Sequence, residues 1–157
     1  IMSSFHLAQL NVAKMKADID DPIMKGFVDY LDEVNAIADN SPGFVWRLET
    51  DEGDATDIRV FEDNMLLVNM SVWESIDDLK KFVYDSFHLE ILKRKKEWFD
   101  KFDGVFQVMW WVKAGTVPDV DEARARLSYL QEHGVSELAF NFQRSFPAAE
   151  KYLTLPT

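Results

Sequence analysis

The stretch LLVNMSVWES, residues 66–75, alternates two kinds of side chain and therefore predicts a β-strand with two unlike faces. One face is purely apolar and holds Leu66, Val68, Met70 and Val72. The other mixes amide, hydroxyl and indole groups and holds Leu67, Asn69, Ser71 and Trp73. A sheet that simply faced water would carry Lys, Glu and Thr on its second face. The pattern therefore indicates a second face that is shielded but needs hydrogen-bond partners.

Other segments repeat this division. Strands are predicted at 5–12, 44–49, 105–113 and 138–144, with a short hairpin arm at 58–61. The sides that match the mixed side of 66–73 carry Leu7, Gln9, Asn11, Val105, Gln107, Met109, Trp111, Ala139, Asn141 and Gln143. In 44–49 the assignment is ambiguous, and Arg47 is expected on the same side. We call this surface of the sheet the mixed face, and its opposite the apolar face.

Helices are predicted between the strands. Asp21 and Pro22 suit a helix start and Ser41-Pro42-Gly43 its end. Ser75 and Asp78 form a capping-box pattern that begins a second helix, which breaks at Asp85-Ser86 and continues to about Phe99. A third helix runs from Pro118 to Gly134.

The resulting order, βαββαβ followed by a helix and a strand, predicts an α+β, ferredoxin-like fold with a C-terminal helix-strand extension. A chain of this length fits one domain, expected over 2–157, with a core at 5–113, an extension at 114–144 and a tail at 145–157. Two helices are expected to cover the apolar face and leave the mixed face bare. The extension is expected along or across a dimer edge.

A bare mixed face has two explanations. It can pack on an identical sheet, with amides paired across a homodimer interface. It can instead line a cavity for a small, mostly apolar ligand with a few polar atoms. Both hold together if two sheets meet at their edges and leave a pocket in each, whereas a face that is all interface has no pocket.

Composition excludes several classes of function. The chain has no cysteine, which rules out disulfides, thiolate metal sites and a cysteine nucleophile. The formal net charge of −11 repels phosphate backbones, so no nucleic-acid partner is expected. No apolar run is long enough for a membrane span, and the first residues lack the pattern of a secretory signal. A cytoplasmic location is expected.

Three stretches resemble a known family: SPGFVWR (41–47), LLVNMSVWES with the following helix DSFHLEILKRKKEWF (85–99), and VMWWVKAG (108–115). They are similar to a bacterial family of unknown function in the dimeric α/β-barrel superfamily, alongside the antibiotic-biosynthesis and haem-degrading monooxygenases. The resemblance implies a homodimer whose sheets form a barrel, with a cleft between sheet and helices in each subunit. It implies no particular reaction.

His88 is the first candidate for catalysis. It lies in the first turn of a predicted helix segment, where the helix dipole disfavours imidazolium and keeps a neutral base near pH 7. Members of the superfamily place a histidine near this position, but the iron-binding histidine of the haem-degrading branch falls at Ile91 here. The competing interpretation of His88 is a surface histidine at a helix start.

The mixed face supplies the other candidates. Asn11 lies where the haem-degrading branch has a functional asparagine, which implies that it orients a substrate oxygen or dioxygen. The candidate substrate-binding residues are Asn69, Ser71, Trp73, Gln107, Trp111 and Arg47. Amides can position a substrate or polarise a carbonyl but cannot act as bases, and a dimer-interface role fits them equally. The indoles would form the wall of a pocket. Arg47 can bind a carboxylate or enolate oxygen, or pair with Glu49 or Asp32.

These features favour an enzyme that acts on a small conjugated or aromatic substrate, as a cofactor-free oxygenase or isomerase. No phosphate-binding loop, histidine pair or nucleophile elbow occurs, and no cofactor or metal is expected. The alternatives are a non-catalytic binding or stress-response module that uses the same pocket, and a haem-dependent variant in which His88 or another ligand reaches iron.

Overall fold

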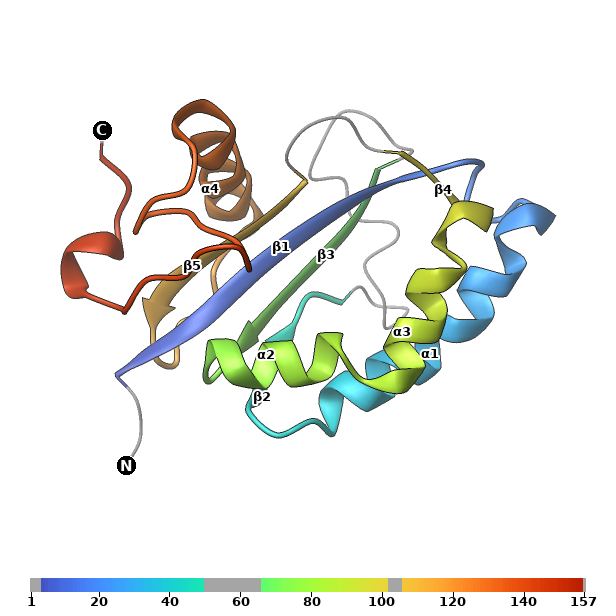
Figure 1. Ribbon diagram of the computed structural model, residues 1–157, viewed down its shortest axis with the longest axis horizontal. Coiled ribbons are helices and arrows are strands. Elements are labelled where there is room, and N and C mark those ends of the chain that lie inside the picture. Colours follow the sequence, from blue (N-terminus) through green and yellow to red (C-terminus); the bar gives the residue numbers. More distant parts are fainter. Residues whose placement is uncertain (1–3, 50–65, 102–105, 157) are drawn as a thin grey trace.

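The computed structural model describes residues 4–49, 66–101 and 106–156 (Figure 1). Inside helix α3, the side chains of residues 86–88 are also outside this description. The predicted arm at 58–61 and the acidic stretch at 50–57 therefore lie outside the described residues. None of the described helices is long and apolar enough to cross a membrane.

The strands form one antiparallel sheet with the longest strand inside it. β1 (Phe5–Met15) pairs with β3 (Leu66–Trp73) on one side and with β5 (Gln107–Lys113) on the other. β2 (Phe44–Arg47) adds to the outer edge of β3. The order β2-β3-β1-β5 is that of the ferredoxin-like fold, which confirms the predicted fold class. The two-residue β4 (Phe99–Asp100) pairs with the end of β1.

The first two helices begin where the capping signals predicted, and the third begins two residues after the predicted Pro118. The Asp21 side chain accepts a hydrogen bond from the Ile23 N–H and begins a 3-10 turn, η1 (Pro22–Met24), which leads into α1 (Lys25–Asp39). Ser75 accepts from the Asp78 N–H at the start of α2 (Ile76–Val83). Asp119 caps α4 (Val120–His133), and Gly134 ends it with a φ of +76°.

The predicted helix break is present, but the segment after it is shorter than expected. α3 runs only over Ser86–Lys93 and is followed by a 3-10 turn, η2 (Lys95–Glu97). The Trp98 carbonyl then accepts a hydrogen bond from the Lys16 N–H at 2.8 Å, and Phe99 pairs with Met15. The backbone groups that would continue the helix are therefore hydrogen-bonded to the end of the sheet instead.

The sorting of residues into two faces is confirmed by strand register in β1, β3 and β5. It is wrong in 138–144, because Phe140 pairs with Met109 and packs on the mixed face while Ala139 joins the core of the apolar face. Gln9 lies opposite Ser71 on one side and Met109 on the other, and Asn11 lies opposite Asn69 and Gln107. In β2, an irregularity between Phe44 and Trp46 places Phe44 opposite Trp73 and Arg47 opposite Ser71, so that both belong to the mixed face.

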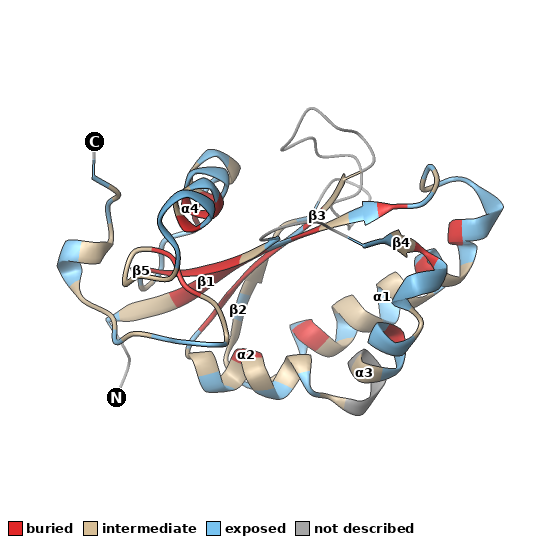
Figure 2. Ribbon diagram, turned by 45° about the horizontal axis from the view of Figure 1, so that its top comes forward, coloured by how far each residue is buried: buried red, intermediate tan, exposed pale blue. Residues whose placement is uncertain are grey.

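The expectation about which layer covers each face is wrong. The apolar face packs against α4, whose Ala123, Leu127 and Leu130 join its core. Helices α1–α3 lie on the other side of the sheet, against the mixed face (Figures 1 and 2). The tryptophans and Met109 make the mixed face apolar enough to pack, so it is not left for an identical sheet.

Two apolar clusters join the mixed face to these helices. The first, here the tryptophan cluster, is centred on Leu7, Trp73, Met109, Trp111, Phe140, Leu79 of α2 and Ala38 of α1. The second, here the Phe27 cluster, contains Met15, Met24, Phe27, Ile91 and Trp98, with Leu67 packed against it. Because Leu7 and Met15 lie near opposite ends of β1, the clusters hold the two ends of the mixed face and leave its middle between them.

The predicted strand at 138–144 is reduced to isolated bridges. Phe140 exchanges both backbone hydrogen bonds with Met109, at 2.8 and 2.9 Å, on the outer edge of β5. Beyond it, the Asn141 side chain accepts a hydrogen bond from the Gln143 N–H at 2.9 Å, a local turn that ends the pairing. The chain ends with a 3-10 turn, η3 (Glu150–Tyr152).

Candidate functional site

Three carboxamides cross the middle of the mixed face in one row. Asn11 of β1 lies opposite Asn69 of β3 and Gln107 of β5, and side chains of directly opposed residues stand side by side on one face. We call these three residues the amide row. Asn11 and Asn69 are exposed although both belong to inner strands, and Gln107 is half-buried. The mixed face is therefore open to solvent between the tryptophan cluster and the Phe27 cluster.

A buried glutamine beside this row fixes the orientation of Asn69. Gln9 is 6% exposed, and its Nε2 donates to Asn69 Oδ1 and to Ser71 Oγ, both at 2.8 Å. Trp73 Nε1 also donates to Ser71 Oγ at 2.8 Å. Because the Asn69 oxygen accepts from Gln9, the Asn69 NH₂ group is the end left to donate. Ser71 accepts two hydrogen bonds and likewise keeps its own proton to donate.

This polarity defines what the row can bind. A side chain that offers N–H donors fits a carbonyl, phenolate or enolate oxygen and does not fit a donor group. Donors held in place before a ligand arrives stabilise negative charge that develops on such an oxygen without any reorganisation. The row can therefore orient a ligand and polarise it, whereas proton removal needs another group.

The two candidate indoles lie inside the tryptophan cluster. Trp73 has no exposed surface; its ring stacks on Phe82 with centroids 5.2 Å apart and meets Phe44 edge-on. Trp111 is 9% exposed, and its Nε1 donates to the Phe146 carbonyl at 2.8 Å. Gln9, Ser71 and Met109 lie between both rings and the amide row, and the role of the rings as a pocket wall stays a prediction.

Arg47 is on the mixed face but has protein partners. Its Nε and Nη2 donate to the two carboxylate oxygens of Asp39, at 2.8 and 3.3 Å, and Glu49 lies 3.6 Å from Nη2. Glu49 is one of the two partners weighed from sequence, whereas Asp39 takes the place of Asp32. Two carboxylates beside one guanidinium offset the positive charge that an anionic ligand would need. Binding by Arg47 stays a prediction.

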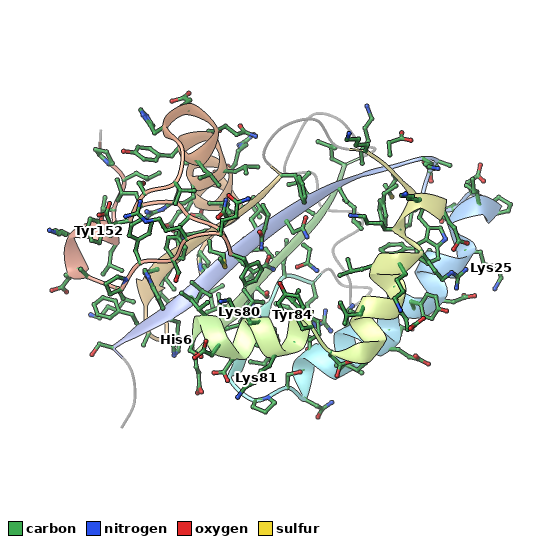
Figure 3. The ribbon with its side chains drawn as sticks, viewed as in Figure 1. His6, Lys25, Lys80, Lys81, Tyr84 and Tyr152 are labelled. Carbon is green, nitrogen blue, oxygen red and sulfur yellow. The ribbon has the colours of Figure 1, made fainter. Side chains whose placement is uncertain are left out.

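The candidate histidine and three other titratable residues remain to be placed relative to the amide row. His88 belongs to α3, but its side chain lies outside the described part, so its role as a base stays a prediction. Figure 3 shows Lys80 of α2 on the side toward β1 and Lys81 on the opposite side, while His6 lies at the start of β1. Within the described ranges, no three His, Asp or Glu side chains gather as a metal site.

A small pocket lies at one end of the amide row. It has a volume of about 250 Å³ and is lined by Phe106, Gln107, Asn141, Phe142 and Gln143. Gln107 therefore belongs both to the row and to the pocket. The sequence placed Asn141 and Gln143 among the mixed-face amides but did not select them as site residues, because nothing local shows that the extension meets the edge of β5.

Two further residues were missed by the sequence analysis. Gln9 was assigned to the mixed face, yet its partners depend on the register of β1 against β3. Arg126 of α4 is 1% exposed and donates to the carbonyls of Leu138, Tyr152 and Leu153 at 2.8–3.1 Å. Burial lowers the pKa of Arg126, and the nearby Glu122 opposes this shift. An arginine in an amphipathic helix gives no sequence signal for such a role.

Several solved structures are similar to the chain. A Nitrosomonas europaea protein provisionally named an antibiotic biosynthesis monooxygenase is 10% identical, with a TM-score of 0.47 over 76% of this chain and 98% of its own. SnoaB from Streptomyces nogalater, a cofactor-independent oxygenase, is 14% identical in a mutant form, with a TM-score of 0.46 over 74% of this chain and 100% of its own.

The protein PA3566 from Pseudomonas aeruginosa is 10% identical, with a TM-score of 0.48 over 74% of this chain and 99% of its own. Similarity at this level does not transfer a reaction from one protein to another. No curated protein matches the sequence. A family model does match, over residues 6–154, and the chain therefore belongs to the family of the domain of unknown function DUF3291.

Proposed function

We propose that the chain binds a small, mostly apolar molecule with an acceptor oxygen at the amide row, and acts on it as a cofactor-free oxygenase or isomerase. The observation that carries the proposal is the exposure of Asn11 and Asn69 in the middle of inner strands, on the side where the chain's own helices pack. Polar groups at that place, flanked by apolar clusters, are typical of a ligand site.

The geometry supports a division of roles. Asn69, oriented by Gln9, donates to the ligand oxygen and favours its enolate form, and Asn11 positions the same ligand from the neighbouring strand. His88 is the proposed base that removes a proton from the carbon next to the carbonyl. If the proton is then returned to a different carbon of the substrate, the reaction is an isomerisation.

Transfer of electrons from the enolate to dioxygen makes the protein an oxygenase. A methylene group and dioxygen then give a carbonyl and water, and the substrate supplies all four electrons. No electron donor other than the substrate is needed, which fits a chain without a cofactor motif. A haem-dependent reaction stays an alternative prediction that rests on the unplaced His88 side chain.

The test uses 2-tetralone, an aromatic ketone with an acidic methylene group next to its carbonyl. Binding is measured by quenching of tryptophan fluorescence, proton removal by deuterium exchange at the methylene carbon in NMR, and oxygenation by oxygen uptake. We expect exchange in the wild type, loss of exchange with binding retained in His88→Ala, and weakened binding in Asn69→Ala. Gln131→Ala, an exposed change on α4, serves as the control.

Each other outcome has a definite meaning. Binding without exchange or oxygen uptake supports the non-catalytic module and contradicts the enzyme. Exchange that survives in His88→Ala contradicts the role of that residue. Equal binding by wild type and Asn69→Ala contradicts the site itself. The predicted homodimer is tested separately by native mass spectrometry, where a monomer would contradict it.

A further inference from the structure

We infer that the ligand site has a second subsite at the edge of β5, and that the site as a whole fits an elongated, flat apolar molecule with an acceptor oxygen at each end. The inference rests on the proposed function for the first subsite, at Asn69. The second subsite is the pocket lined by Phe106, Gln107, Asn141, Phe142 and Gln143.

The two subsites are continuous along the amide row. Asn69, Asn11 and Gln107 occupy directly opposed positions on three neighbouring strands, so the row runs across the sheet and not along one strand. Two strand spacings give about 10 Å between its ends. Gln107 closes the row and lines the pocket, which places the pocket directly beyond the far end.

The second subsite offers the same kind of hydrogen-bonding group as the first. The Asn141 oxygen accepts the Gln143 N–H at 2.9 Å, so that the Asn141 NH₂ group is the end left to donate. Asn69 is held in the corresponding state by Gln9. Both ends of the site therefore present amide donors, and a matching ligand carries acceptor oxygens at both of its ends.

The walls of the second subsite indicate the character of the ligand between those oxygens. Phe106 is 42% exposed beside the pocket, and Phe142 is half-buried next to the tryptophan cluster. Aromatic rings beside amides favour a flat, conjugated group that stacks or packs edge-on. Because Asn141, Phe142 and Gln143 belong to the C-terminal extension, the extension determines the length of the ligand.

The probes are two biaryl ketones that differ in one acetyl group: 4,4′-diacetylbiphenyl, with an acceptor at each end, and 4-acetylbiphenyl, with one. Dissociation constants are measured by quenching of tryptophan fluorescence. In the wild type we expect the second acetyl group to tighten binding about five- to tenfold. In Asn141→Ala the ratio of the two dissociation constants should fall to about one, while 4-acetylbiphenyl binds as in the wild type. Gln131→Ala keeps the full gain.

The outcomes separate this inference from the proposed function. If 4-acetylbiphenyl binds through Asn69 but the second acetyl group adds nothing, or adds as much in Asn141→Ala, the second subsite is overturned and the proposed function stands. If neither ketone binds the wild type, both are overturned. Circular dichroism of Asn141→Ala checks its fold. A Phe142→Leu variant, which retains an apolar side chain, should lower the affinity for 4,4′-diacetylbiphenyl more than for 4-acetylbiphenyl.

Discussion

Gln9 Nε2 lies 2.8 Å from Asn69 Oδ1, and this hydrogen bond joins a buried amide of β1 to an exposed amide of β3. The second hydrogen of the same nitrogen goes to Ser71 Oγ, which Trp73 also contacts. The packed tryptophan cluster and the open amide row are thus connected through one side chain. A buried residue therefore determines which end of the Asn69 amide faces the proposed ligand site.

Replacement of Gln9 by leucine is expected to impair both stability and binding. The change leaves Asn69 Oδ1 and Ser71 Oγ without a donor that they have in the wild type. Asn69 is open to water and Ser71 keeps its hydrogen bond from Trp73, so neither acceptor is left buried and unpaired. The two lost hydrogen bonds should together lower the free energy of unfolding by about 1–3 kcal/mol. The freed Asn69 amide can also rotate, so that affinity for 4-acetylbiphenyl should fall about fivefold or more. Urea unfolding and fluorescence titration measure the two effects.

Gln131→Leu is the matched control, because it makes the same chemical change at an exposed position of α4. Its stability is expected to stay within about 0.5 kcal/mol of the wild type, with unchanged affinity. A Gln9→Leu variant that binds the ketone as tightly as the wild type would show that Asn69 keeps its orientation without Gln9, or does not contact the ligand.

Local patterns in the sequence predicted the features that depend only on neighbouring residues, namely strand faces and helix caps. Alternation assigned Asn11, Asn69 and Gln107 to one face because the pleat of a strand fixes which neighbours share a side. The N-cap at Ser75 could be predicted in the same way, since its partner Asp78 is three residues away. The ferredoxin-like order followed from the sequence of elements.

What the sequence could not predict depends on contacts between distant segments. The apolar face is covered by α4, whose Leu127 and Leu130 pack on it, and no local signal states which layer covers which face. The irregularity in β2 separates Phe44 from Trp46 only through pairing with β3. The partners of Gln9 likewise depend on the register of β1 against β3, and the place of Asn141 beside Gln107 depends on the path of the extension.

Arg126 is expected to be the largest single polar contribution to holding the C-terminal extension. Its guanidinium donates to three backbone carbonyls and is almost fully buried. Arg126→Leu removes all three donors and should lower the free energy of unfolding by about 2–4 kcal/mol. Arg126→Lys should recover less than half of the loss, because an ammonium group lacks the planar fork. Urea unfolding measures both.

The control for Arg126 is Arg124→Leu, two residues away on the same helix. Arg124 is exposed and pairs with Asp121 at 2.9 Å, an interaction of at most about 1 kcal/mol. Limited proteolysis should cut the segment around Arg144 and Lys151 faster in Arg126→Leu than in Arg124→Leu. Equal stability of the two variants would contradict the proposed role of Arg126.

The contact between Arg94 and Glu97 is expected to make stability depend on pH in the acidic range. Two hydrogen bonds from Arg94, at 2.7 and 3.1 Å, hold the pKa of Glu97 below its ordinary value of 4.5. A carboxyl whose pKa is lower in the folded state stabilises the fold above its unfolded pKa and loses this contribution as pH falls through the folded pKa. The wild type should therefore exceed Glu97→Gln in stability at pH 7 but not in strong acid.

Urea midpoints of the wild type and Glu97→Gln at pH 7, 5, 4 and 3 test this expectation. Glu90→Gln is the control, because its one contact with Lys93 is longer, at 3.4 Å, and both side chains are well exposed. A difference between wild type and Glu97→Gln that grows toward low pH has the wrong sign and would contradict the argument.

Alanine substitutions at two glycines distinguish the cost of backbone strain from the cost of a steric clash. Gly43 and Gly115 both have positive φ, +81° and +87°, a region that costs other residues about 1–2 kcal/mol. A Cβ on Gly115 would meet no atom within 4 Å, so Gly115→Ala should show this cost alone. A Cβ on Gly43 would collide with the Asp78 side chain, which also accepts a hydrogen bond from the Ser75 hydroxyl at 2.9 Å. Gly43→Ala should therefore lower the free energy of unfolding, measured in urea, more than Gly115→Ala does. The difference is the loss of the hydrogen bond between Ser75 and Asp78. In the background of Asp78→Gly, which removes both the colliding carboxylate and the Asp78 Cβ, the two alanine variants should cost nearly the same. An excess cost at Gly43 that survives there would place its origin in the backbone and not at Asp78.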